Sequence, residues 1–95
     1  MPYEYTVPAG YAEEEIKELI DESLASRLEF AQRRCATYQT RYAVFEQQYG
    51  MSSQEFLDKF ESGALDDQQE WFDWYAALEG KKIWSRKYDI LAHLV

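Results

Sequence analysis

An unbroken heptad pattern of apolar residues in the first half of the chain constrains its fold more than any other feature. Apolar side chains recur there at alternating intervals of four and three residues. The pattern comprises Leu24, Leu28, Ala31, Cys35, Tyr38, Tyr42, Phe45 and Tyr49. This spacing is typical of a long α-helix that packs lengthwise against another helix. The chain is therefore predicted to be all-α, with these eight residues forming a helix–helix interface, here called the seam.

The length of the predicted helix indicates that the seam joins two chains. The helix is expected to occupy residues 11–50, beginning near Ala12 and ending at Gly50, where glycine suits a left-handed C-cap. At about 1.5 Å per residue it would be roughly 57 Å long. A compact domain of this size is only about 30 Å across. Because one chain could not cover such a helix, we expect a homodimer, a dimeric helical assembly held along the seam.

A short strand is predicted before the long helix. Residues 3–7 read Tyr-Glu-Tyr-Thr-Val, an alternation of apolar and polar residues that favours a β-strand. A single strand needs a partner, so we expect it to pair with a second chain or with a partner's sheet edge. The alternative is that residues 1–10 form an extended arm on the helices.

Two further helices are predicted after the long one. Ser52 and Glu55 have the spacing of a capping box, which indicates a short helix over residues 52–62. A third helix is expected over residues 66–94, with Asp66 or Asp67 as its N-cap. Its Gly80 indicates either a kink or a close helix contact. All of these elements are predicted to belong to a single domain, residues 1–95.

The charge of the chain restricts its partners. The net charge is −8, and residues 50–79 alone carry −7. Phosphate backbones repel such a chain, so nucleic acid is not expected to bind the free protein, whereas a basic protein surface would attract it. No apolar run is long enough to cross a membrane, no signal peptide is recognisable, and there is one cysteine. These features predict a cytoplasmic protein.

The sequence contains no recognisable catalytic apparatus. An acidic cluster of Asp66, Asp67, Glu70 and Asp73 could hold a divalent cation, but the same residues suit the start of a helix. His93 is the only histidine, and Cys35 lies on the seam, where packing explains it. We therefore expect no enzyme activity, no cofactor and no metal site.

Aromatic residues in the third helix are candidates for partner binding. Four of them, Trp71, Phe72, Trp74 and Tyr75, are too close in sequence to share one helix face. Some must therefore lie at the surface, where aromatic side chains often anchor interfaces. The predicted partner-binding residues are Trp71, Trp74, Tyr75 and Trp84. A basic patch of Lys81, Lys82, Arg86 and Lys87 is the alternative, as a nucleic-acid contact.

Three segments resemble a family of small prokaryotic proteins. They read YGMSSQEF over residues 49–56, KFESG over 59–63 and EWFDWYAALEG over 70–80. This pattern is similar to that of antitoxin-like members of toxin–antitoxin systems. The resemblance implies a non-catalytic antitoxin that binds a basic toxin and neutralises it by occlusion. The alternatives are a small nucleic-acid-binding regulator and a purely structural helical assembly module.

Overall fold

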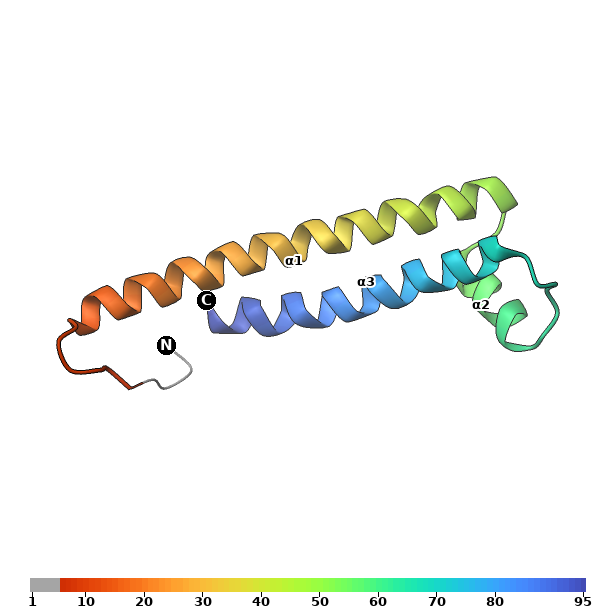
Figure 1. The fold of residues 1–95 in the computed structure, drawn as a ribbon. Coiled ribbons are helices and arrows are strands. Elements are labelled where there is room, and N and C mark those ends of the chain that lie inside the picture. The colour runs from red at the N-terminus through yellow and green to blue at the C-terminus, as the bar shows by residue number, and fades with distance from the viewer. Residues whose placement is uncertain (1–5) are drawn as a thin grey trace.

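The computed structural model describes residues 6–95 as a long helical hairpin with a short helix at its closed end (Figure 1). Its helices are α1 (Glu13–Tyr49), α2 (Ser53–Glu61) and α3 (Gln69–Leu94). The molecule measures 62 × 21 × 19 Å. The predicted all-α class, with a long, a short and a second long helix, is confirmed.

The N-terminal strand is not supported. Tyr3, Glu4 and Tyr5 lie outside the described residues, and Thr6 and Val7 form no strand. The long helix begins at Glu13, after Ala12, whose backbone is extended and whose side chain makes no capping bond. Three glutamates fill the first turn instead, where the helix dipole favours negative charge.

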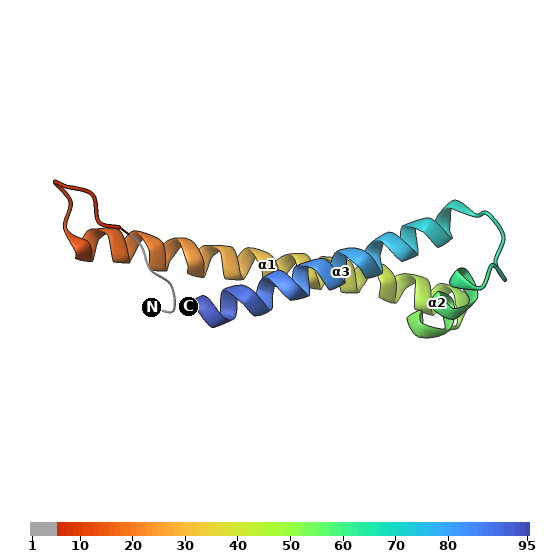
Figure 2. The ribbon, with the colours of Figure 1, turned by 90° about the horizontal axis from the view of Figure 1, so that it is seen from below.

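The seam of α1 packs against α3 of the same chain. The two helices run antiparallel and lie side by side in Figure 1, and α3 crosses α1 in the view of Figure 2. Near the closed end the ring centroids of Tyr49 and Trp71 are 4.6 Å apart, and further along Cys35 Sγ lies 3.7 Å from Ser85 Oγ. Seven of the eight seam residues are partly buried, and the eighth, Ala31, is fully buried. The second helix of the seam is therefore α3, and no second chain is needed to bury these residues.

An aromatic core fixes the closed end of the hairpin. Phe56 of α2 stacks on Trp74 of α3 with ring centroids 4.1 Å apart, and both side chains are fully buried. Phe45 of α1 also stacks on Trp74, with ring centroids 5.7 Å apart. The indole N–H of Trp74 donates a hydrogen bond of 3.1 Å to Ser53 Oγ. These contacts join all three helices through one side chain, Trp74.

The start of α2 matches half of the predicted capping box. Ser52 Oγ accepts a hydrogen bond of 3.1 Å from the backbone N–H of Glu55. The carboxylate of Glu55 lies instead 3.3 Å from Lys59 Nζ, in an exposed ion pair. The backbone N–H of Ser53 donates to Glu46 Oε2 of α1 at 3.0 Å. A glutamate of the preceding helix thus satisfies one of the free N–H groups of α2.

The third helix begins later than predicted, and neither predicted aspartate caps it. Its N-cap is Gln68, which makes no side-chain capping bond. Asp66 Oδ1 accepts a hydrogen bond of 2.7 Å from the indole N–H of Trp71 and so holds the loop against the core. The prediction that Asp66 or Asp67 caps the helix is therefore wrong: Gln68 is the N-cap, and Asp66 bonds a side chain in the first turn of α3.

The N-terminal part of α1 extends beyond the end of α3 (Figure 1). At the open end of the hairpin, Leu94 of α3 lines a shallow hollow together with Leu19, Ile20, Ser23 and Leu24 of α1. Residues 13–23, here called the overhang, therefore have α3 beside them only at their last turn. Leu19 in this segment is 64% exposed.

Candidate binding surfaces

Two of the four predicted partner-binding residues belong to the core. Trp71 is 6% exposed and Trp74 is fully buried, and both lie in the aromatic cluster with Phe56. Their positions three residues apart place both rings on the side of α3 that faces α1 and α2. Neither ring is available to a partner in this conformation, which corrects their prediction as surface anchors.

A different set of aromatic residues reaches the surface at the closed end. Phe72 is 49% exposed, and its ring meets that of Phe60 edge-on with centroids 5.6 Å apart. The ring of Tyr75 also stacks on that of Phe60, with centroids 5.2 Å apart. Both Phe60 and Tyr75 are partly buried. We call these three residues the closed-end patch. Among the predicted anchors, only Tyr75 belongs to it.

The closed-end patch lies within the most acidic part of the chain. Residues 50–79 contain eight acidic residues and one lysine. Exposed Glu61 and Asp73 directly follow Phe60 and Phe72 in sequence. Hydrogen bonds from Trp71 and then Gln68 lower the pKa of Asp66, which favours its charged form. An apolar patch with negative surroundings suits a positively charged protein surface.

A second surface combines arginines and aromatic rings along the hairpin. The guanidinium of Arg27 lies 5.3 Å from the ring centroid of Trp84, and that of Arg34 lies 5.7 Å from it. The ammonium of Lys87 is 4.5 Å from the same ring. These are cation–π distances. Trp84, the fourth predicted anchor, is partly buried beneath these three cations. It does not belong to the closed-end patch.

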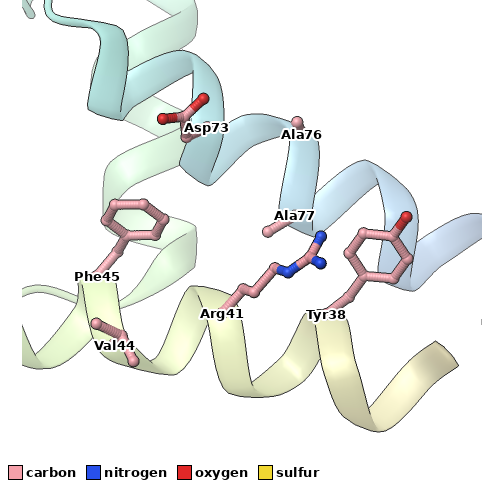
Figure 3. Close-up of a pocket in the computed structure, with 7 residues that line it drawn as sticks. All are labelled: Tyr38, Arg41, Val44, Phe45, Asp73, Ala76 and Ala77. Carbon is pink, nitrogen blue, oxygen red and sulfur yellow. The ribbon is translucent and has the colours of Figure 1, made fainter. Parts of the chain in front are cut away.

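The same side of the hairpin carries an open groove. It has a volume of about 450 Å³ and is lined by Tyr38, Arg41, Val44, Phe45, Asp73, Ala76 and Ala77 (Figure 3). Tyr38, Arg41, Val44 and Phe45 line it from α1, and Asp73, Ala76 and Ala77 line it from α3. The Arg41 side chain points toward Ala77 (Figure 3). Residues seven apart lie on the same side of a helix. This relation places Arg34 and Arg27 in line with Arg41.

On α3, Ile83 and Ile90 follow Ala76 at the same seven-residue interval. We call this surface the open face. Its residues are Arg27, Arg34, Arg41 and Val44 of α1 with Ala76, Ile83, Lys87 and Ile90 of α3. Val44, Ile83 and Ile90 are each about half exposed. Over residues 6–95, the ion pairs join Arg33 to Glu29 and Lys59 to Glu55, so the four cations of the open face form no ion pair within the described chain. Asp73 lines the same groove as Arg41.

The residues considered for chemistry are separated in the structure. Cys35 packs against Ser85, whereas the His93 ring is hydrogen-bonded to the carbonyl of Asp89 within α3. Asp66 bonds Trp71, and Asp73 accepts a bond from Gln69. The part of the chain that the structure describes contains no group of three or more metal-ligating side chains. It also contains no helix long and apolar enough to cross a membrane.

The predicted basic patch is also divided. Lys87 lies on the open face over Trp84, whereas Lys81 lines a hollow on another side of the helix pair with Cys35 and Ser85. The arginines of α1 are the cations that the sequence reasoning missed as a group. Their seven-residue spacing, residues 27, 34 and 41, is the signal that identifies them.

Comparisons of the chain with protein-family models, with characterised proteins and with solved structures gave no significant match.

Proposed function

We propose that the protein is a non-catalytic binding protein that covers a basic surface of a partner protein with its closed-end patch. Residues 49–80 resemble antitoxin-like proteins. On this basis the proposed partner is a toxin, which the protein neutralises by covering its active surface. The observation that carries the proposal is the half-exposed ring of Phe72, packed on Phe60 and Tyr75 within a segment of net charge −7.

The packing beneath the patch supports this role. Phe60 contacts Phe56 with ring centroids 5.4 Å apart, and Phe56 is fully buried against Trp74. The exposed rings therefore rest on the best-packed part of the molecule. An aromatic anchor that is already ordered loses little conformational freedom on binding. The surrounding carboxylates would accelerate encounter with a cationic partner and oppose binding of acidic ones.

A nucleic-acid-binding regulator is the second candidate, and the open face is the observation that favours it. Its four cations lie over aromatic rings, an arrangement that suits stacked bases and phosphates. The net charge of −8 opposes this function, because the remainder of the chain repels a polyanion.

Co-expression with the products of the adjacent genes tests the proposed function. The chain should co-purify with a basic protein, and Phe72→Ala combined with Tyr75→Ala should abolish that capture while the helix content and melting temperature stay near those of the parent. Tyr11→Ala is a matched control, since Tyr11 is an exposed aromatic residue outside the closed-end patch. A folded double variant that still captures the partner would contradict the assignment to this patch.

A further inference from the structure

The overhang is an acidic helix with an apolar side that is only partly covered: Leu19 is exposed, and Ile16 and Ile20 are partly buried. Residues 13–23 contain six acidic residues and one lysine. Ile16, Leu19 and Ile20 follow helical spacing along one side of the segment. Only the last turn of this side meets α3, at Leu94, in a hollow of about 420 Å³. The segment therefore has the composition of a helix that packs on an apolar and cationic surface.

The open face of the same chain is such a surface. Its exposed apolar residues are Val44, Ile83 and Ile90, and its cations form no ion pair within residues 6–95. We infer that two copies of the chain form a dimer in which the overhang of each lies on the open face of the other. This inference is independent of the proposed function, which uses the closed-end patch.

The spacing of the charges fits this arrangement. The arginines of the open face recur every seven residues, about 10.5 Å along α1. Acidic residues that flank the apolar side of the overhang recur at the same interval, Glu15 with Glu22. An overhang laid antiparallel to α1 of a second copy can thus place successive carboxylates beside successive arginines. Such pairs set register and partner choice between packed helices.

Two-fold symmetry closes the assembly. Each copy supplies one overhang and one open face, so a two-fold axis generates two identical contacts and leaves neither surface unpaired. Pairing of two open faces with each other is disfavoured, because it would bring Arg27, Arg34, Arg41 and Lys87 against like charges. The chain itself therefore carries the acidic and apolar occupant that the open face requires.

Charge reversal on each surface tests the dimer by sedimentation velocity. The parent chain should sediment as a dimer that weakens as salt is raised. Arg27→Glu with Arg34→Glu, and separately Glu15→Lys with Glu22→Lys, should each give a monomer. An equimolar mixture of these two variants should form a dimer again, since each reversed surface then meets a reversed partner. A chain carrying all four substitutions should also dimerise.

Controls separate this result from unfolding and from anion binding. Lys59→Glu with Lys82→Glu makes the same change in charge away from the open face and should leave the dimer intact. A parent chain that is monomeric throughout the micromolar range would overturn the inference. So would two variants that remain monomeric when mixed although circular dichroism shows them folded. Retention of a monomeric parent by duplex DNA or RNA, lost in the arginine variant, would assign the open face to nucleic acid instead.

Discussion

Gly80 of α3 lies directly against the ring of Tyr38 of α1. A Cβ atom at Gly80 would be 2.5 Å from Tyr38 Cε1 and 2.6 Å from Cζ. The helix is continuous through this glycine, so the residue marks a close helix contact and not an end of α3. Two arginines of α1 also contact Tyr38. Its hydroxyl accepts a hydrogen bond of 2.6 Å from Arg34, and the guanidinium of Arg41 lies 5.2 Å from its ring centroid.

We expect Gly80→Ala to destabilise the protein by about 1–3 kcal/mol, because the added methyl group overlaps the Tyr38 ring. Alanine would otherwise stabilise this position by about 1 kcal/mol through helix propensity. The same change in a Tyr38→Ala background should therefore be stabilising. Urea unfolding of the parent, the two single variants and the double variant gives the four free energies of unfolding. A stabilising Gly80→Ala in the parent would show that the two helices are further apart than described.

The cap of α2 should contribute to stability without taking part in binding. Ser52→Ala removes the acceptor of the Glu55 N–H and should lower the free energy of unfolding by about 1 kcal/mol. Ser23→Ala is a matched control, since the exposed Ser23 hydroxyl only donates to a carbonyl of its own helix. It should change stability by less than about 0.5 kcal/mol. Loss of partner capture by a fully folded Ser52→Ala chain would assign this serine to the binding surface.

The bond between Asp66 and Trp71 should make stability depend on pH. The lowered pKa of Asp66 means that the folded state favours its carboxylate. Its contribution is fully present above the unfolded-state pKa of about 4 and is lost as pH falls through the folded-state value. Asp66→Asn should reduce this acid-side dependence. Thermal melts of both chains between pH 7 and pH 3 measure the difference, and identical profiles would contradict the expectation.

The sequence predicted the helices and their apolar sides, because periodicity and capping depend on neighbouring residues. The seam, the left-handed Gly50 and the Ser52 cap all follow from such local signals. The partner of the seam did not follow. The apolar spacing of α1 can be matched equally well by α3 of the same chain and by a helix of a second copy. Only the turn at the closed end determines that α3 folds back on α1.

The surface anchors were predicted poorly for a related reason. Trp71 and Tyr75 share a helix side, yet one is buried and the other is partly exposed. That difference depends on where α2 packs, which no pattern within α3 encodes. Asp66 had the sequence position of an N-cap, but its carboxylate bonds the Trp71 indole. The capping rule fails here because a hydrogen bond to a nearby side chain competes for the same carboxylate.

The final prediction contrasts two neighbouring aromatic residues of α3. Trp74 is fully buried, stacks on Phe56 and donates to Ser53, so Trp74→Ala should lower the free energy of unfolding by about 3–5 kcal/mol. Phe72 is half exposed and its ring meets that of Phe60 edge-on, so Phe72→Ala should cost about 1 kcal/mol or less. Urea unfolding measures both.

A further variant isolates the hydrogen bond of Trp74 from its packing. Ser53→Ala removes the acceptor of the indole N–H and should cost about 1–3 kcal/mol, because the buried donor loses its partner. In a Trp74→Phe background, which has no indole donor, the same serine substitution should cost much less. Equal costs in the two backgrounds would show that this bond does not stabilise the closed end. A large cost for Phe72→Ala would place that ring in the core and remove the anchor on which the proposed binding surface depends.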